Sequence, residues 1–100
     1  MLVRVGNTKD VVNNEMRVFE VAGTKVNVAN ALGQLYAFDD TCTHRGCSLA
    51  AGNLDDTTVT CACHGSQFDV TSGAVLRGPA QAPVRSRLVQ VSGEDLLVET

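Results

Sequence analysis

Apolar residues in this chain occur in short runs, rich in β-branched side chains, that turn residues separate. Residues 25–29 (KVNVA) show the pattern clearly, because polar and apolar side chains alternate there as in a half-buried strand. Runs of this kind predict strands at residues 2–5, 17–21, 25–31, 34–38, 57–61, 67–70, 88–91 and 96–99. The pattern is typical of an all-β fold.

Turn residues mark the ends of these runs. Gly23, Gly33 and Gly93 each stand between two predicted strands, and glycine adopts the backbone conformations that tight turns need. Residues 10–14 form either one short turn of helix or a loop. No segment keeps a helical period, and there is no repeat, low-complexity segment or long linker.

The order of the runs predicts a scaffold with an insertion, within one domain of 100 residues. Residues 1–40 and 84–100 supply base strands that close as a small sandwich or partial barrel. Residues 41–83 form a lobe with short strands and long loops. Its last part, residues 77–83, contains both prolines of the chain and is expected to be irregular.

Composition narrows the class of protein. With 44% hydrophobic residues the chain is globular, and a net charge of −3 without a basic run argues against nucleic-acid binding. No apolar stretch approaches the roughly 18 residues that a membrane helix needs. The first residues show no secretory or twin-arginine signal. We therefore expect no membrane anchor and a soluble, cytoplasmic protein.

The candidate chemistry lies in the lobe. Cys42 and His44 form a Cys-x-His motif, and Cys61 and His64 form a Cys-x-x-His motif, which together contain both histidines and two of the four cysteines. Two thiolates and two imidazoles can bind a metal, and a structural zinc site is one alternative. Zinc fingers usually pair Cys with Cys and His with His in sequence, whereas each motif here is mixed. The remaining two cysteines are either bridged or free.

The segments CTHRGC (residues 42–47) and CACHGS (residues 61–66) resemble the two cluster-binding loops of Rieske [2Fe–2S] proteins. In particular, they look like the disulfide-containing branch that the cytochrome bc complexes typify. Residues 78–80 (GPA) resemble the proline loop that covers the cluster in that family. The resemblance is dense over residues 42–79. It implies stacked antiparallel sheets, with the cluster-binding lobe on the base.

The resemblance implies a ligand set for a Rieske [2Fe–2S] cluster. Cys42 and Cys61 would bind one iron, and His44 and His64 would bind the other. Replacing two thiolates by neutral imidazoles turns a dianionic oxidised cluster into a neutral one, which is easier to reduce.

The same resemblance assigns roles around the ligands. Cys47 and Cys63 would form a disulfide that joins the two loops, and Ser66 would donate a hydrogen bond to a cluster sulfide. The other residues of this shell are Gly46 and Gly65, which permit tight turns, Pro79 in the covering loop, and Phe68. Phe68 stands where high-potential relatives carry a tyrosine, so we expect an intermediate reduction potential.

With these features the chain resembles a Rieske-type ferredoxin, so we expect a soluble one-electron carrier that is not itself an enzyme. The implied donor is a flavin-dependent reductase, and the implied acceptor is an oxygenase or another oxidoreductase. Arg45, His44 and His64 are the candidate docking residues. The alternatives are a small subunit of a larger oxidoreductase complex, which an extensive apolar face around the histidines would favour, and a redox sensor module.

Several charged residues receive a plainer interpretation. Arg85 and Arg87 alternate at the start of a predicted strand and are expected to be solvated. The pairs Asp39-Asp40 and Asp55-Asp56 are expected to be turn residues.

Overall fold

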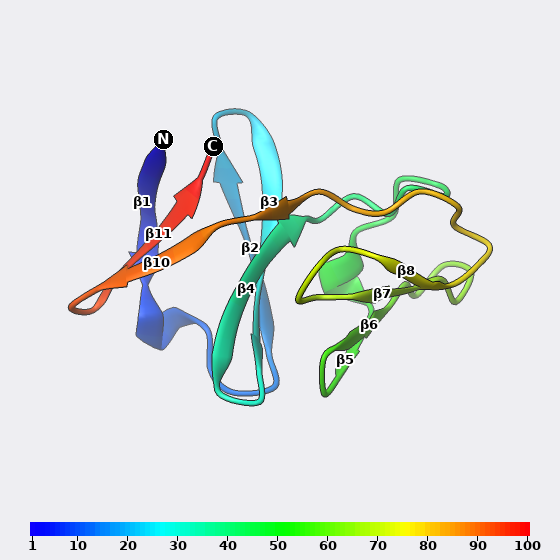
Figure 1. The fold of residues 1–100 in the computed structure, drawn as a ribbon, viewed down its shortest axis with the longest axis horizontal. Coiled ribbons are helices and arrows are strands. Elements are labelled where there is room, and N and C mark those ends of the chain that lie inside the picture. The colour runs from blue at the N-terminus through cyan, green and yellow to red at the C-terminus, as the bar shows by residue number, and fades with distance from the viewer.

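The computed structural model describes residues 1–100, which form three antiparallel sheets stacked along the molecule (Figure 1). The terminal sheet has the order β1 (Leu2–Asn7), β11 (Asp95–Glu99), β10 (Val89–Ser92). The central sheet has the order β2 (Met16–Val21), β3 (Thr24–Ala31), β4 (Gln34–Asp39), β9 (Ser86–Arg87). The lobe sheet has the order β5 (Asn53–Asp55), β6 (Thr58–Thr60), β7 (Gln67–Asp69), β8 (Val75–Arg77). These sheets confirm the predicted all-β fold.

Two tight turns fix the register of the central sheet. Ala22 and Gly23 join β2 to β3 with φ values of 49° and 82°, and Leu32 and Gly33 join β3 to β4 with φ values of 54° and 83°. Two consecutive positive φ values are the mark of type I′ turns, whose twist matches that of the paired strands. Both loops therefore have two residues, as the glycines at these positions indicated.

The middle of strand β3 in the central sheet is buried on both faces. Val26 and Val28 of β3 pack with Leu96 and Val98 of the terminal sheet in one core cluster. Ala29 and other residues of the opposite face belong to a second core cluster, which extends into the lobe. The half-buried pattern predicted for residues 25–29 was therefore wrong in one respect, because a second layer covers the face that includes the polar residue Asn27.

The second core cluster joins the central sheet to the cluster-binding lobe. Its members are all buried and come from β3, β4, the lobe strands and the loops between them: Ala29, Ala31, Phe38, Cys42, Leu49, Val59, Cys61, Phe68, Val70, Ala80 and Val84. Two of the cysteines of the candidate site are thus part of this core. Their backbones are held by the same packing that attaches the lobe to the base.

Three short strands and two short helices were not predicted. Strands β5, β8 and β9 have two or three residues each, too few for an alternating pattern. The helix η1 spans Thr8–Asp10 and shares only Asp10 with residues 10–14, for which the sequence left open a short turn of helix or a loop. Asn7 caps it: the Lys9 N–H donates to Asn7 Oδ1, and the Asn7 N–H donates to Asp10 Oδ2. The helix η2 spans Leu49–Ala51.

Two charged residues predicted to be solvated or in turns are buried. The Arg87 side chain is 5% exposed, and its Nε lies 2.6 Å from Asp39 Oδ1 in an ion pair between β9 and β4. Its Nη1 donates to the Glu99 carbonyl at 3.1 Å. Asp40 is 2% exposed. The prediction that Arg87 is solvated was wrong, because its partner Asp39 lies 48 positions away in sequence. Asp39 lies in β4 rather than in a turn, whereas Asp40 follows β4 directly.

The two chain ends lie side by side in the base. The Thr100 N–H donates to the Met1 carbonyl at 2.9 Å, and Figure 1 places both ends on the side of the molecule away from the lobe. No helix in the structure has the length and apolar character needed to cross a membrane.

Candidate metal centre

The first cluster loop, residues 42–47, is a compact turn closed by two backbone hydrogen bonds. The Cys42 N–H donates to the Cys47 carbonyl at 2.8 Å, and the Gly46 N–H donates to the Cys42 carbonyl at 2.8 Å. Gly46 has a φ of 77°, a conformation that glycine adopts without steric cost. The candidate ligands Cys42 and His44 lie at the start and in the middle of this loop.

The second cluster loop, residues 61–66, closes in the same way. The Cys61 N–H donates to the Ser66 carbonyl at 2.8 Å, and the Gly65 N–H donates to the Cys61 carbonyl at 3.1 Å. Gly65 has a φ of 78°. The two loops therefore share one backbone design although their sequences differ at several positions.

The four candidate ligands separate into a buried pair and an outer pair. Cys42 and Cys61 are free thiols, 2% and 3% exposed. His44 is half-buried and His64 is exposed. The two imidazole rings have centroids 5.1 Å apart and planes at 87° to each other. The loops thus bring the two histidines together from positions 20 residues apart in sequence.

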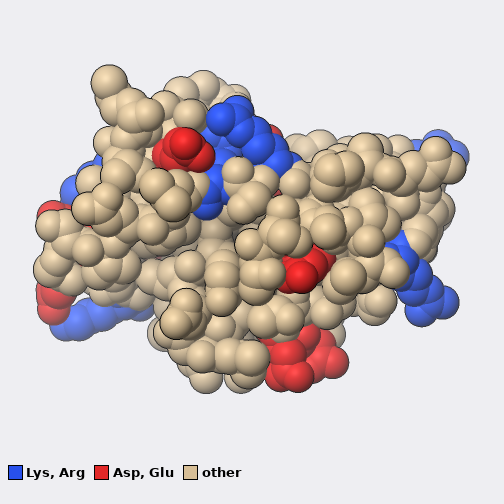
Figure 2. All heavy atoms as spheres, in the orientation of Figure 1, with Lys and Arg blue, Asp and Glu red and all other residues tan.

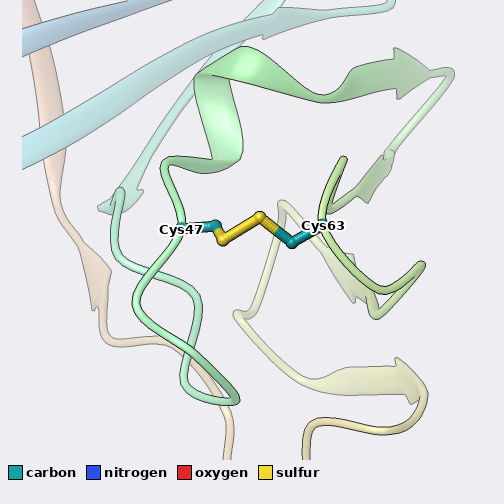
Figure 3. Close-up of a disulfide and its surroundings, with 2 residues drawn as sticks. All are labelled: Cys47 and Cys63. Atoms are coloured by element: carbon teal, nitrogen blue, oxygen red, sulfur yellow. A yellow bond between two sulfur atoms is a disulfide. The ribbon is translucent and has the colours of Figure 1, made fainter.

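A disulfide between Cys47 and Cys63 joins the two loops (Figure 3). The alternative of two free thiols at these positions is therefore wrong. The Sγ atoms of Cys47, Cys61 and Cys63 lie within 4.8 Å of one another. A bridged sulfur is not a thiolate, so of these three only Cys61 can serve as a metal ligand.

The donor set fits a Rieske [2Fe–2S] cluster. Such a cluster needs two thiolates on one iron and two neutral imidazoles on the other. The chain offers two free cysteines within its core and two histidines with adjacent rings at the surface. This division into an inner sulfur side and an outer nitrogen side matches the two unlike irons of the cluster.

The segment of residues 78–83, which we call the covering loop, is tied to both cluster loops. The Ala80 N–H donates to Ser66 Oγ at 3.0 Å. The Thr43 hydroxyl donates to the Ala82 carbonyl at 2.6 Å. Ser66 is completely buried, so its hydroxyl does not face solvent. Since Ser66 Oγ accepts from Ala80, its own proton remains available for a second partner.

Thr43 was not recognised from the sequence. It lies between the candidate ligands Cys42 and His44, and only its hydroxyl group indicated that it could form a hydrogen bond. The residue that it binds, Ala82, is 39 positions further along the chain. Pro79 is exposed in the covering loop.

Phe68 packs in the core of the lobe. It is completely buried, and in β7 it pairs with Val59 of β6. Ser66 and Phe68 are both buried while Gln67 between them is half-buried, so the two side chains lie on the same side of the segment. Phe68 is thus a core residue on the same side of the segment as Ser66.

The end of the molecule that carries the cluster loops is basic on the visible face. Figure 2 shows Lys and Arg atoms but no acidic atoms at the right-hand end, where Figure 1 places the loops. Arg45 of the first loop and Arg77 at the end of β8 are both exposed. Neither forms an ion pair. Arg77 was not singled out as a docking candidate from the sequence.

A pocket of about 470 Å³ lies elsewhere, lined mainly by residues of the base. Residues of β4, β9 and β10 line it, together with Thr71 and Glu99, and none of the candidate ligands does. It is therefore separate from the candidate metal centre.

Comparison with known proteins places these features in a family. The family model for the Rieske [2Fe-2S] domain matches residues 1–92. The ferredoxin component of biphenyl 2,3-dioxygenase from Rhodococcus jostii is 34% identical over 98 residues, covering 98% of this chain and 92% of that protein.

Solved structures agree. The ferredoxin of carbazole 1,9a-dioxygenase from Nocardioides aromaticivorans superposes with a TM-score of 0.93 at 30% identity, covering 98% of this chain and 96% of that one. A chain from the complex of reduced oxygenase and oxidized ferredoxin in carbazole 1,9a-dioxygenase gives a TM-score of 0.91 at 30% identity, covering 97% and 91%.

Proposed function

Because this chain belongs to the Rieske [2Fe-2S] domain family, we propose that it carries single electrons from a flavin-dependent reductase to an oxygenase or a similar acceptor. The chain is a Rieske-type electron carrier with a [2Fe–2S] cluster, like the ferredoxin components to which it is similar. The observation that carries the proposal is the joining of two cysteine–histidine loops into one site with buried thiols and adjacent imidazoles.

The residues of the two loops divide the work of holding the cluster. Cys42 and Cys61 would bind one iron from within the core, and His44 and His64 would bind the other near the surface. When bound, the cluster takes up and releases one electron. The disulfide between Cys47 and Cys63 holds the two halves of the ligand set together. The half-buried and exposed imidazoles provide the shortest route from the site to a docked partner.

The surface around the histidines favours a mobile carrier over a permanent subunit. Of the seven large exposed apolar side chains, only Leu76 belongs to residues 41–83. A permanent interface would need a larger apolar area. Arg45 and Arg77 instead give this end of the molecule a basic rim. We infer that the partner presents an acidic face to the histidines, because complementary charge speeds the encounter of short-lived complexes.

The oxygenase acceptor rests on the relatives. One solved complex contains a ferredoxin and the oxygenase of carbazole 1,9a-dioxygenase.

With the four candidate ligands engaged, the site has no open coordination position for a substrate, so the chain itself would not be an enzyme. The cytoplasmic location expected from the sequence stays a prediction.

The rate of electron transfer to small charged oxidants tests both the carrier role and the basic rim. The protein, reduced by one electron with dithionite, is mixed with ferricyanide or with hexaammineruthenium(III) at increasing salt concentration. The net charge of −3 should repel ferricyanide, whereas a local basic rim should attract it. We expect the rate with ferricyanide to fall as salt rises, because salt screens the attraction, and the rate with the ruthenium cation to rise.

Arg45→Glu should reverse the salt dependence of the ferricyanide reaction. Arg17→Glu is the matched control, because Arg17 is an exposed residue of β2 in the base and the change in net charge is the same. Equal effects of the two substitutions would show that only the net charge matters and would overturn the docking proposal. A protein that takes up no electron from dithionite would overturn the carrier role.

A further inference from the structure

Asp40 is a buried carboxylate at the base of the first cluster loop. It follows β4 directly, lies two residues before Cys42, and is 2% exposed. The three ion pairs of the structure involve Arg4, Lys9 and Arg87, and none of them includes Asp40. A carboxylate that is buried without a cation needs strong hydrogen-bond donors in place of water.

Three donors surround this carboxylate. Asn27 Nδ2 lies 3.0 Å and the Ala50 N–H 2.9 Å from Oδ1, and the Ser48 hydroxyl donates to Oδ2. The Asp40 carbonyl also accepts from the Leu49 N–H at 2.8 Å. The segment that follows Cys47 is therefore attached to the residue that precedes the first loop, and Asp40 closes the loop at its base.

The orientation of Asn27 indicates that this site is built for a negative charge. Asn27 is completely buried in β3, and its Oδ1 has no hydrogen-bond partner. Its Nδ2 points to Asp40 Oδ1 and also contacts Met16 Sδ at 3.4 Å. The Asn27 amide leaves its own oxygen without a partner, while its N–H donates to the carboxylate. A hydrogen bond to a charged acceptor is stronger than one to a neutral acceptor, so a charged acceptor offsets the unpaired oxygen better.

We propose that Asp40 is a potential-setting residue, whose fixed negative charge beneath the first loop opposes electron uptake at the metal centre. The proposal rests on the function proposed above. Reduction adds a negative charge to the metal centre, for which Cys42 is a proposed ligand. Water and salt screen a buried charge such as that of Asp40 far less than a surface charge. Asp40 also positions the loop through its hydrogen bonds, so a test must separate its charge from its contacts.

Asp40→Asn makes that separation. An asparagine side-chain oxygen can accept from Asn27 and Ala50, and its amide can donate to the Ser48 hydroxyl, which accepts as well as donates. The contacts remain while the charge is lost. Asp56→Asn is the control, because Asp56 is an exposed residue of the lobe with a φ of 53°, which asparagine tolerates. Asp40→Ala removes both the charge and the contacts.

The midpoint potential of the loaded protein, from a dye-mediated titration followed by EPR, gives the answer. Asp40→Asn should raise the equilibrium constant for reduction about tenfold, a shift of about 59 mV for a one-electron couple, with the EPR signal unchanged. Asp56→Asn should leave the equilibrium constant for reduction unchanged, because water and salt screen an exposed charge. Asp40→Ala should also shorten the time for which the protein retains iron.

An unchanged or lower potential in Asp40→Asn, with the EPR signal preserved, would overturn the inference. If this variant does not load, the infrared spectrum of wild-type protein with ¹³C-labelled aspartate decides: a carboxylate band that shifts on reduction supports the inference, and a protonated carboxyl band for Asp40 overturns it. Absence of a Rieske EPR signal in the wild type would instead be a failure of the proposed function.

Discussion

Cys47 and Ser66 occupy equivalent positions in the two cluster loops. Each carbonyl accepts a 2.8 Å hydrogen bond from the N–H of the free cysteine five residues earlier, Cys42 or Cys61. The two side chains have different roles. Cys47 forms the disulfide with Cys63, and Ser66 accepts a hydrogen bond from the Ala80 N–H of the covering loop. The same backbone turn thus supports a disulfide to the other cluster loop in one case and a hydrogen bond to the covering loop in the other. Each can be tested separately.

Replacing either histidine of the proposed ligand set should abolish the Rieske signal. Wild-type protein should contain about two irons and two labile sulfides per chain and show EPR with an average g below 2 after reduction. His44→Ala or His64→Ala should lose this signal, whereas Arg45→Ala, next to His44, should keep it. Stoichiometric zinc without labile sulfide, in protein purified from its native host, would contradict the ligand assignment.

Removing the disulfide should weaken the lobe. The bridged residues are 16 positions apart, and a crosslink of that span contributes about 3 kcal/mol to the free energy of unfolding. Cys47→Ser with Cys63→Ser should lose about that amount in urea unfolding of the cluster-free protein. In loaded protein it should speed cluster loss and lower the midpoint potential. If both thiols of native folded protein react with an alkylating agent in mass spectrometry, this expectation fails.

The hydroxyl of Ser66 should raise the reduction potential. A hydroxyl that donates to a cluster sulfide stabilises the reduced state, which carries more negative charge. Ser66→Ala should lower the midpoint potential by about 50–100 mV and loosen the covering loop, because the Ala80 N–H loses its acceptor. Ser72→Ala is the control: it removes a similar bond from the Ala74 N–H outside the loops. A potential that changes equally in both variants would argue against the role of Ser66.

A hydroxyl added at Phe68 should shift the potential the other way. Phe68→Tyr should raise it by a similar amount, about 50–100 mV, with the visible spectrum preserved. Phe38→Tyr is the matched control, because Phe38 is equally buried in the same core cluster but lies on β4 of the central sheet. If a crystal structure places the new hydroxyl against a cluster sulfur and the potential is unchanged, the tuning argument is wrong.

The ion pair of Arg87 and Asp39 should matter for stability rather than for electron transfer. Asp39→Asn leaves the Arg87 guanidinium buried without its counter-charge, which should cost about 3 kcal/mol in urea unfolding. The surface pair of Arg4 and Asp95, with both side chains more than half exposed, gives the comparison. Asp95→Asn should cost less than about 1 kcal/mol. Equal losses in the two variants would show that the burial of Arg87 has no energetic role.

Local patterns in the sequence predict the longer strands and the turns between them. Residues 25–29 alternate polar and apolar side chains as a strand does, and Gly33, between the strands predicted at residues 25–31 and 34–38, lies in the observed type I′ turn. The candidate ligands were also recognisable because each motif is local, with its cysteine and histidine only two or three positions apart. Their assembly into one site needed the fold.

Residues whose environment depends on distant partners were missed. Arg87 and Asp40 look like surface charges in sequence, yet Arg87 contacts a carboxylate 48 positions away and Asp40 binds Asn27 of another strand. The burial of Asn27 follows from the lobe that covers its face of β3. None of these relationships has a sequence period, because each depends on how the three sheets stack.

Because Met1 and Thr100 are adjacent, either end of this protein is a suitable point for attaching a linker. A linker at either end would leave from the base and keep the histidines free for a redox partner. The chain could therefore be tethered to an electrode by one end, with its basic rim facing solution. A short peptide that joins the two ends would also make a circular chain, in which new ends could be opened in the hairpin between β10 and β11.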